Sequence, residues 1–290
     1  MKPILYYFSG TGNTLVTTRK VANKIDGKIV PIPIYNKAET VEPEADIFGI
    51  LFPVYYADLP IIVREFTNKL SKIEDKYIFT VCTYGGSAGI TFDSLDKIIK
   101  ARGGKISLNY GIHLPQNAFN KPWANNKKIQ AKLNVRIKKL VKYINNKKEG
   151  TYSRDIIIRV LANSFTSKFQ NMYKKELVKI SGYPIDSSMD ILIHNADNSY
   201  KVNEDCNGCG ICKRVCPVNN IEMVSDEPKW LNKCENCLAC YNFCPKKAIK
   251  GGVVVKDYYY THPDISYSDM INKKKFHIIK TIVYKKSLKC

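Results

Sequence analysis

The stretch ILYYFSGTGNT at residues 4–14 decides the fold of the N-terminal half of the chain. Its first five residues are apolar or aromatic and predict a buried strand, and the turn after them leads into a helical pattern that runs to about Ile25. Hydroxyl groups and glycine amides at the start of a helix suit a phosphate group, because the helix N-terminus attracts negative charge. The turn therefore predicts a phosphate site formed by Ser9, Gly10, Thr11, Gly12, Asn13 and Thr14.

This phosphate loop differs from the loops that bind ATP or dinucleotides. It lacks the Gly-Lys-Ser/Thr ending of a Walker A loop, and Leu15 stands where the dinucleotide fingerprint has its third glycine. The phosphate of a mononucleotide is therefore the expected ligand.

Strand and helix patterns continue to alternate as far as residue 148, which predicts an α/β domain with a parallel sheet. Further strands are expected at residues 29–34, 46–54, 77–83 and 106–112, and further helices at 60–70, 89–101 and 126–148. Five strands of this kind suit a doubly wound, flavodoxin-like parallel sheet of order 2-1-3-4-5.

Two more loops follow predicted strands at the edge where open α/β sheets bind ligands. Aromatic side chains in them can stack on a flat ring, and glycines let the backbone approach it. Ordinary turns would explain one such loop but explain three in register poorly. The candidate ring-binding residues are Pro53, Val54, Tyr55, Tyr56, Thr83, Tyr84, Gly85 and Gly86.

With these loops, residues 1–148 resemble flavodoxins. The segment FSGTGNT at residues 8–14 is similar to their FMN phosphate loop, and residues 53–60 and 83–89 are similar to the two loops that flank the isoalloxazine ring. The resemblance implies that the chain binds FMN, a cofactor that carries one or two electrons.

Eight of the ten cysteines form two runs of the pattern Cys-x-x-Cys-x-x-Cys-x-x-x-Cys-Pro. Each cysteine of the second run lies 28 residues after its counterpart in the first, which indicates an internal duplication. Three thiolates at this spacing can reach three irons of a cubic cluster from one tight loop, while the fourth iron needs a more distant ligand. Structural zinc is the alternative, but it leaves a third and fourth cysteine in each run without a role.

Residues 203–250 closely resemble the two-cluster bacterial-type ferredoxins, which implies a small α+β domain with two [4Fe-4S] clusters. In that family the fourth cysteine of each run binds the other cluster. The resemblance thus assigns one cluster to Cys206, Cys209, Cys212 and Cys244, and the second to Cys234, Cys237, Cys240 and Cys216.

The expected domains are residues 1–148, a basic helical connector at 149–202, the ferredoxin domain at 203–252 and a tail at 253–290. The order of these parts is similar to the flavodoxin–ferredoxin fusion family of anaerobes. The connector carries apolar residues at helical spacing before a stop at Gly182 and Pro184, to which only a packing role is given: Leu161, Phe165, Phe169, Met172, Tyr173, Leu177 and Ile180. Cys82 is expected to be buried, and Cys290 receives no role.

The formal net charge is +20, and residues 113–202 hold 17 Lys and Arg against 6 Asp and Glu. A basic surface can attract an acidic redox partner such as a ferredoxin or flavodoxin, an anionic membrane face or nucleic acid, or it can simply be solvated. Charge is the sole indication of nucleic acid, so none is expected. The sequence has no run of 18 apolar residues and no signal-peptide pattern, so a cytoplasmic protein without a transmembrane segment is expected, with peripheral membrane contact left open.

These features predict an electron-transfer protein in which two clusters exchange electrons with FMN and relay them to or from a partner. Two alternatives remain open. In the first, FMN is the site of a reductase that acts on a small organic acceptor, such as a quinone or nitro compound. In the second, the clusters form an iron or oxygen sensor without catalysis. Turnover with an organic acceptor distinguishes the first alternative, and clusters without flavin distinguish the second.

Overall fold

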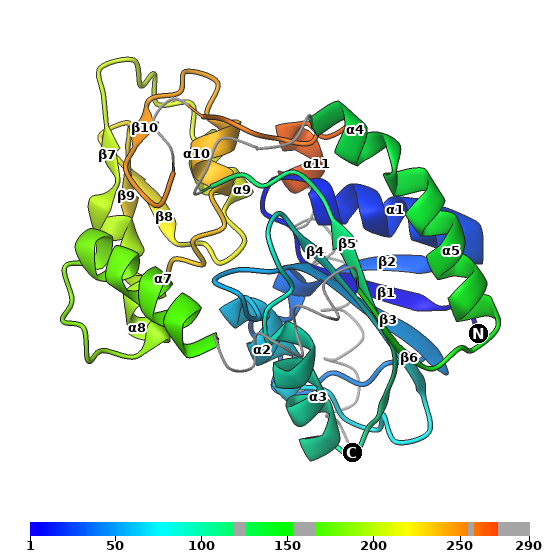
Figure 1. Ribbon diagram of the computed structural model, residues 1–290. Coiled ribbons are helices and arrows are strands. Elements are labelled where there is room, and N and C mark those ends of the chain that lie inside the picture. Colours follow the sequence, from blue (N-terminus) through cyan, green and yellow to red (C-terminus); the bar gives the residue numbers. More distant parts are fainter. Residues whose placement is uncertain (119–125, 154–165, 255–257, 272–290) are drawn as a thin grey trace, which may run out of the picture.

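The computed structural model describes residues 1–118, 126–153, 166–254 and 258–271. Its main sheet is parallel throughout and has the order β2-β1-β3-β4-β5-β6 (Figure 1). The strands are β1 (Ile4–Tyr7), β2 (Lys28–Pro31), β3 (Ile47–Pro53), β4 (Tyr77–Tyr84), β5 (Ile106–His113) and β6 (Gly150–Tyr152). The predicted order 2-1-3-4-5 is confirmed, with one strand added at the edge.

The extra strand β6 pairs with β5 from Leu108–Gly150 to Tyr110–Tyr152 and lies in the segment predicted as a connector. It is three residues long, begins with glycine and has no fully buried residue. Such a strand carries no apolar run and no clear alternation, so periodicity could not reveal it.

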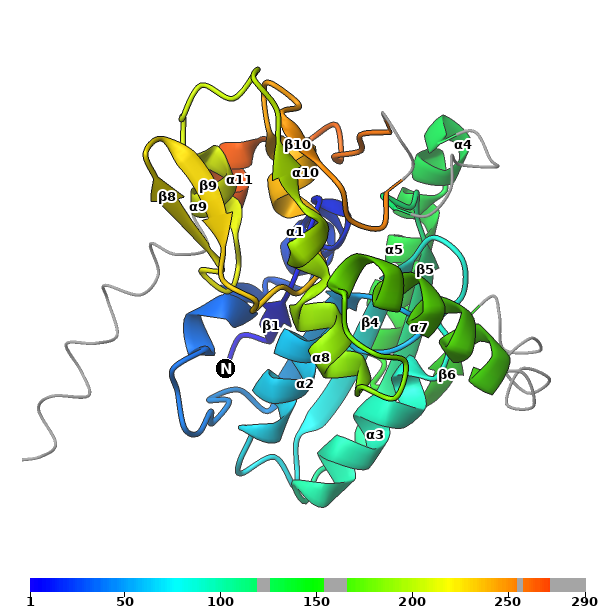
Figure 2. The ribbon, with the colours of Figure 1, turned by 90° about the vertical axis from the view of Figure 1, so that its left-hand side faces the viewer.

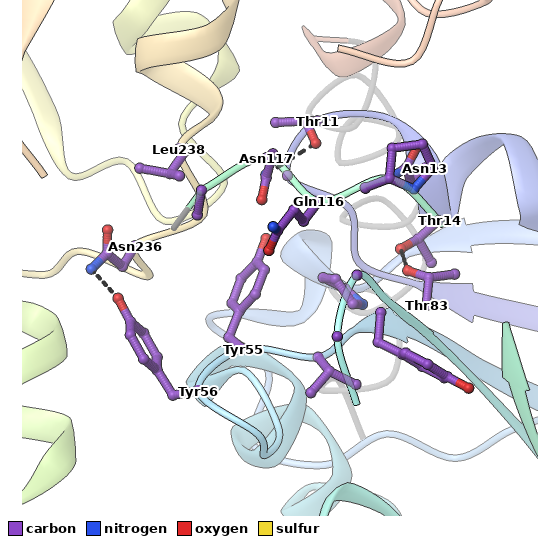
Figure 3. Close-up of a pocket in the computed structure, with 18 of the residues that line it drawn as sticks. Thr11, Asn13, Thr14, Tyr55, Tyr56, Thr83, Gln116, Asn117, Asn236 and Leu238 are labelled. Carbon is purple, nitrogen blue, oxygen red and sulfur yellow. Dashed lines mark hydrogen bonds between the residues drawn. The ribbon is translucent and has the colours of Figure 1, made fainter. Parts of the chain in front are cut away.

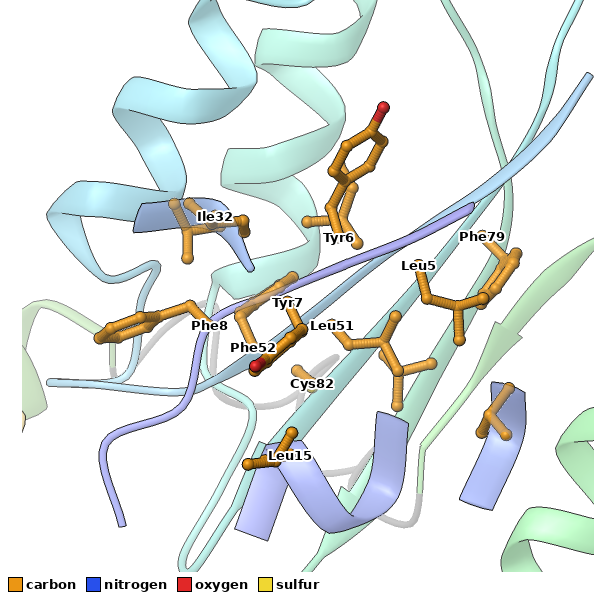
Figure 4. Close-up of a cluster of buried hydrophobic side chains, with 14 of the residues drawn as sticks. Leu5, Tyr6, Tyr7, Phe8, Leu15, Ile32, Leu51, Phe52, Phe79 and Cys82 are labelled. Carbon is orange, nitrogen blue, oxygen red and sulfur yellow. The ribbon is translucent and has the colours of Figure 1, made fainter. Parts of the chain in front are cut away.

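Helices cover both faces of the sheet. In Figure 1, α1 (Asn13–Ile25) and α5 (Leu133–Asn145) lie together on one face, whereas α2 (Ile61–Asn68) and α3 (Thr91–Ala101) lie on the other. The central strands are buried on both faces, as the apolar run of β3 predicts. Figure 4 shows the core between the sheet and its helices, where Leu5, Phe52, Phe79 and Cys82 have no exposed surface.

Two predicted elements differ in detail from the structure. The strand expected at residues 29–34 ends at Pro31, and a 3-10 helix, η1 (Ile32–Tyr35), follows, because Pro31 and Pro33 have no N–H to donate to a sheet. The helix expected at residues 126–148 is divided into α4 (Asn126–Ala131) and α5. The break is local, since Lys132 between them keeps helical angles of φ −76° and ψ −11°.

The C-terminal half is built from short elements around two antiparallel pairs, β7 with β10 and β8 with β9. Its elements are α7 (Thr166–Ser181), α8 (Met189–His194), η2 (Ala196–Ser199), β7 (Lys201–Val202), α9 (Ile211–Val215), β8 (Ile221–Val224), β9 (Glu227–Trp230), α10 (Ala239–Phe243), β10 (Ile249–Lys250) and α11 (Tyr267–Ile271). Helices α9 and α10 pack together and are offset by the same 28 residues as the cysteine runs, which confirms the duplication.

Two further expectations concern the connector and the tail. Of the connector pattern, Leu161 and Phe165 lie outside the described residues, as does Cys290, whereas α7 ends at Ser181, just before Gly182. The first part of the tail returns to the N-terminal domain, where Ile265 and Met270 join the main core (Figure 2). In the described part of the chain, no helix has both the length and the apolar character needed to cross a membrane.

Candidate functional site

A cavity of about 900 Å³, open to solvent, lies at the carboxyl edge of the sheet (Figure 3). Every residue predicted for the phosphate loop and the two ring-binding loops lines this cavity, with the exception of Gly12. The three loops follow β1, β3 and β4, whose carboxyl ends meet at one edge because the strands are parallel. The structure therefore brings the predicted residues together at one site.

Gly12 supports the loop through its backbone. It precedes α1 with φ 103° and ψ −21°, a conformation that favours glycine, and its N–H donates to Ser9 Oγ at 3.1 Å. The amides that follow at the start of α1 have no partner within the helix, so they can serve an anion.

Hydrogen bonds tie the phosphate loop to the neighbouring loops. Thr14 Oγ1 and Thr83 Oγ1 are 2.8 Å apart and link α1 to β4 (Figure 3). Asn13 Nδ2 donates to the carbonyl of Pro115 at 2.8 Å, and Asn117 Nδ2 donates to Thr11 Oγ1 at 3.1 Å. These hydrogen bonds hold the phosphate loop in place from two sides. The loop therefore needs little reorganisation when a ligand binds.

The loop after β3 makes a two-residue turn, and its two tyrosines, Tyr55 and Tyr56, contact different parts of the structure. Tyr56 and Ala57 have φ of 51° and 61°, and reciprocal backbone bonds between Tyr55 and Asp58 of 3.1 and 2.9 Å close the turn. The Tyr55 ring meets Phe8 edge-on at 6.1 Å, whereas Tyr56 accepts a hydrogen bond from Asn236 Nδ2.

The large cavity offers a buried hydroxyl group without a partner in the part of the chain that the structure describes and an open stretch of backbone, both of which a flat, polar ligand could contact. The buried hydroxyl of Tyr55 has no hydrogen-bond partner among the described residues, and burial raises its pKa well above the usual value, so it stays protonated. Buried polar groups in folded proteins normally have partners. A Cβ on Gly86 would meet no atom within 4 Å, so the backbone is open on that side of the cavity. These residues fit a flavin mononucleotide.

Several residues that line the cavity were absent from the predicted set. One group follows β5, and the rule that ligands bind at the carboxyl ends of parallel strands could have found it. Tyr173 of α7 was given only a packing role, yet its ring lies 5.7 Å from that of Tyr56. Ala57 and Ser87 extend the two predicted ring-binding loops, and Asn236, Leu238 and Val253 belong to the C-terminal half, where no local signal marks them. The additional lining residues are Ala57, Ser87, Pro115, Gln116, Asn117, Ala118, Tyr173, Asn236, Leu238 and Val253.

The eight cysteines gather around two further cavities. One is lined by Cys206, Cys209, Cys212 and Cys244. The other is lined by Cys216, Cys234, Cys237 and Cys240. These are the same two sets that the ferredoxin resemblance implies, with the last cysteine of each run reaching the other site.

The two cysteine sites differ in exposure. The four cysteines of the second site are 7–9% exposed, whereas in the first site Cys209 is exposed and Cys206 and Cys244 are half-buried. Burial raises the pKa of Cys234 and Cys240 well above that of a free thiol, so thiolates there need a bound cation or cluster. Backbone amides also point at the sulfurs: Asn236 N–H donates to Cys234 Sγ and Asn220 N–H to Cys216 Sγ, both at 3.2 Å.

The buried cysteine site touches the phosphate loop directly. A Cβ on Gly10 would lie 2.4 Å from the carbonyl oxygen of Cys237 and 2.6 Å from the hydroxyl of Tyr55. Asn236 and Leu238, on either side of Cys237, line the large cavity (Figure 3). A cofactor in the large cavity and a cluster in the buried cysteine site would therefore be neighbours.

The cysteine-rich half matches a known domain family. A family model described as a 4Fe-4S dicluster domain matches residues 205–249. A search of curated proteins finds no significant match. Among solved structures, similarity extends to a putative flavoprotein from Bacteroides eggerthii (21% identity, 46% of this chain and 96% of that one, TM-score 0.31). It extends also to Megasphaera elsdenii flavodoxin (18% identity, 47% and 98%, TM-score 0.31).

The assignment of the two halves rests on the observed strand order and the domain match. The sheet order of the first half is that of flavodoxin-like folds. The eight cysteines of the second half support two clusters. The chain thus joins an N-terminal flavodoxin-like fold to a C-terminal 4Fe-4S dicluster domain.

Proposed function

We propose that this protein relays electrons between two [4Fe-4S] clusters and a bound FMN, and from there to or from a redox partner. The contact of Gly10 with the Cys237 carbonyl carries the proposal, because it places a ligand loop of the buried cysteine site against the phosphate loop. Clusters exchange single electrons, whereas a flavin exchanges one or two, so adjacent sites of these kinds form a converter between the two modes.

The residues present suit each cofactor. Ser9 to Thr14 would hold the FMN phosphate with hydroxyl groups and helix N-terminal amides, and the loops at residues 53–56 and 83–86 would flank the ring. Cys206, Cys209, Cys212 and Cys244 would hold cluster 1, and Cys216, Cys234, Cys237 and Cys240 would hold cluster 2.

Exposure suggests the order of transfer. Cluster 1 would lie at the surface, where Cys209 is exposed, and cluster 2 would lie between cluster 1 and the flavin. A protein partner would then exchange electrons through cluster 1. Electrons would pass from there to cluster 2 and to FMN, or the reverse.

An acidic carrier is the proposed partner. Lys246 lines the cavity of cluster 1, and Arg214 Nη2 donates to the carbonyl of Cys209 at 3.0 Å, so two cations belong to this site. Opposite charges speed encounter, and salt screens them. The rate of electron exchange with an acidic ferredoxin is therefore expected to fall as ionic strength rises, and a rate independent of salt contradicts this partner.

A second candidate function, reduction of a small organic acceptor at the flavin, is favoured by the openness of the large cavity to solvent. It predicts steady turnover with a quinone or nitro compound when the clusters are supplied with electrons. The relay without catalysis predicts reduction of a protein partner and no such turnover.

The decisive experiment begins with anaerobic purification of the full chain and determination of iron, acid-labile sulfide and acid-released FMN per chain. Rapid-mixing absorbance spectroscopy then follows cluster and flavin bands after addition of a one-electron donor. Flavin reduction that trails cluster reduction supports the relay. Clusters without flavin would favour a sensor, and zinc without labile sulfide would overturn both cluster assignments.

A further inference from the structure

The segment Tyr258–Ile271, here called the C-terminal strap, follows the cysteine domain in sequence but runs across the outside of the phosphate loop (Figure 1). The N–H of His262 donates to the carbonyl of Thr11 at 2.9 Å. The hydroxyl of Tyr260 donates to Oδ1 of Asn13 at 2.7 Å. A segment about 250 residues away in sequence thus makes two polar contacts with the loop.

Asn13 is held at both ends of its amide. Its Oδ1 accepts from Tyr260, and its Nδ2 donates to the carbonyl of Pro115. Burial raises the pKa of Tyr260 to about 12, so its hydroxyl remains a donor at neutral pH. Asn13 is the first residue of α1 and lines the large cavity, so its orientation bears on the helix N-terminus that faces a bound phosphate.

Packing reinforces these contacts. A Cβ on Gly12 would lie 2.9 Å from Ile265 and 3.1 Å from Cβ of His262, so the strap lies directly against the loop. Ile265 and Met270 are buried in the main core. Asp269 forms an ion pair of 2.7 Å with Arg19 of α1.

The other end of the strap is fixed to the cluster domain. The N–H of Tyr260 donates to Oδ1 of Asn242 at 2.7 Å, and the ring of Tyr259 stacks on Tyr241 at 4.7 Å. Both partners belong to α10, the helix that contains Cys240. The strap therefore connects the cluster domain to the phosphate loop by a route separate from the Gly10–Cys237 contact.

We propose that Tyr260 is a positioning residue for the phosphate loop, and that the C-terminal strap sets the affinity of the site for the phosphate end of the flavin. This inference rests on the proposed binding of FMN. The effect of Tyr260 is specific to the phosphate, because its hydroxyl contacts Asn13 of the phosphate loop and no strap residue lines the cavity itself. The strap's contact with the loop after β5, from the Tyr258 hydroxyl to the Gln116 carbonyl at 3.0 Å, is made by a different residue and is kept in a Tyr260 variant.

The test compares FMN with riboflavin, which has the same ring and no phosphate. Full-length protein with reconstituted clusters is titrated with each flavin, and quenching of flavin fluorescence gives the dissociation constants. Tyr260→Phe removes the hydrogen bond to Asn13 and the 3.4 Å bond that Gln130 Nε2 donates to the Tyr260 hydroxyl, and it is expected to weaken FMN binding about 3- to 10-fold. Riboflavin binding is expected to stay the same.

Two further variants complete the experiment. Tyr259→Phe is the matched control: the Tyr259 hydroxyl lies against the cluster domain, where it donates to the Lys247 carbonyl and accepts from Lys250 Nζ, both at 3.4 Å, so the flavin affinities should not change. Arg19→Gln breaks the ion pair with Asp269 on the solvent side. This variant is expected to weaken FMN binding about twofold and to leave riboflavin binding unchanged. This variant provides the comparison if Tyr260→Phe fails to retain iron.

The outcomes are distinct. Equal FMN affinity in Tyr260→Phe and wild type overturns the role of the strap while the FMN proposal stands. Equal losses for FMN and riboflavin also overturn it, because the effect would then concern the ring or the whole fold. Wild-type protein that binds neither flavin defeats the proposed function, and the inference with it.

Discussion

Gly10 is the residue at which the phosphate loop meets the buried cysteine site. Any Cβ there would overlap the Cys237 carbonyl and the Tyr55 hydroxyl at 2.4 and 2.6 Å, so one of the two loops must move. We expect Gly10→Ala to slow electron transfer between cluster 2 and FMN, and to lower the free energy of unfolding by about 1–3 kcal/mol. Rapid-mixing spectroscopy measures the first quantity, and denaturant unfolding measures the second.

Gly86→Ala is the control for Gly10→Ala. Gly86 lines the same cavity, but its Cβ would meet nothing within 4 Å, and its φ is not positive. In flavin-free protein this variant should unfold at the wild-type denaturant concentration, because its Cβ meets no atom of the described residues. Equal losses of stability in the two alanine variants would show that overlap between the loops is not the cause of the effect at Gly10.

His262 gives the C-terminal strap a dependence on pH. The ring is buried, and its Nδ1 accepts from the Asp264 N–H at 3.2 Å, which requires the neutral form. Burial lowers the pKa of His262, which Asp264 opposes and Lys20 reinforces. The unfolded chain takes up a proton below a pH of about 6.5. Stability from the neutral ring is therefore present above that pH and is lost as pH falls toward the folded-state pKa.

The measurement for His262 is the unfolding midpoint of wild type and His262→Gln between pH 7.5 and pH 5.5. We expect wild type to lose more stability than the variant over this range. Acid lability of the clusters affects both proteins, so the difference between them isolates the histidine. A difference that does not change with pH contradicts the assigned role of His262.

At the scale of elements, the strands and helices marked by apolar runs or helical spacing were predicted, including the four-residue strand β1, whereas the three-residue strand β6 was not. The buried strands β3 and β4 and the helix α1 follow from continuous apolar runs and helical spacing, which tertiary contacts reinforce. Strand β6 exists because β5 offers it a free edge, which is a tertiary cause that three residues cannot encode.

The candidate site, like the fold, could be predicted only in part from the sequence. Loops after β1, β3 and β4 carry glycines, hydroxyls and aromatics that indicate a ligand. The contributions of Tyr173 and Asn236 arise from packing between segments more than 60 residues apart in sequence, such as the bond from Asn236 to Tyr56. The C-terminal strap was missed for the same reason, since Tyr260 and Asn13 come together only in the folded chain.

The bond between Thr14 and Thr83 joins α1 to β4 at the floor of the cavity. Both side chains are buried, and the hydroxyl oxygens are 2.8 Å apart. Thr83→Val keeps the shape but leaves the Thr14 hydroxyl without this partner. The expected loss in free energy of unfolding is about 1–3 kcal/mol, the usual penalty for a buried polar group left unpaired. Denaturant unfolding of the two proteins measures it.

Thr17→Val is the comparison for Thr83→Val. Thr17 is equally buried, but its hydroxyl donates to the Asn13 carbonyl within the same helix, and this carbonyl also serves the helix backbone. Its removal should cost less than about 1 kcal/mol. Equal losses for the two variants would show that the link between α1 and β4 has no special weight.

At the scale of the whole molecule, the two cysteine sites differ in burial, and the large cavity lies next to the more buried of them. Cluster 1 would sit beside the exposed Cys209, and cluster 2 would be enclosed by cysteines less than a tenth exposed. The large cavity, proposed to hold FMN, follows, bounded by Gly10 and by the residues next to Cys237. The hydrophobic cluster of the C-terminal half contains Cys212, Cys216, Cys234 and Cys240 themselves, so its folding should depend on metal.

This gradient predicts that iron leaves the protein in two phases. A chelator combined with a mild oxidant should remove the iron of cluster 1 first, because solvent reaches Cys209, and the iron of cluster 2 only after the domain opens. Half of the iron is expected in each phase, and loss of cluster 1 should stop reduction by an external protein donor while FMN stays bound. Timed iron release and the magnetic coupling between the clusters follow both events. A single phase that releases all the iron together with the flavin would mean that the two sites open as one unit, and that exposure does not set the order in which they meet the outside.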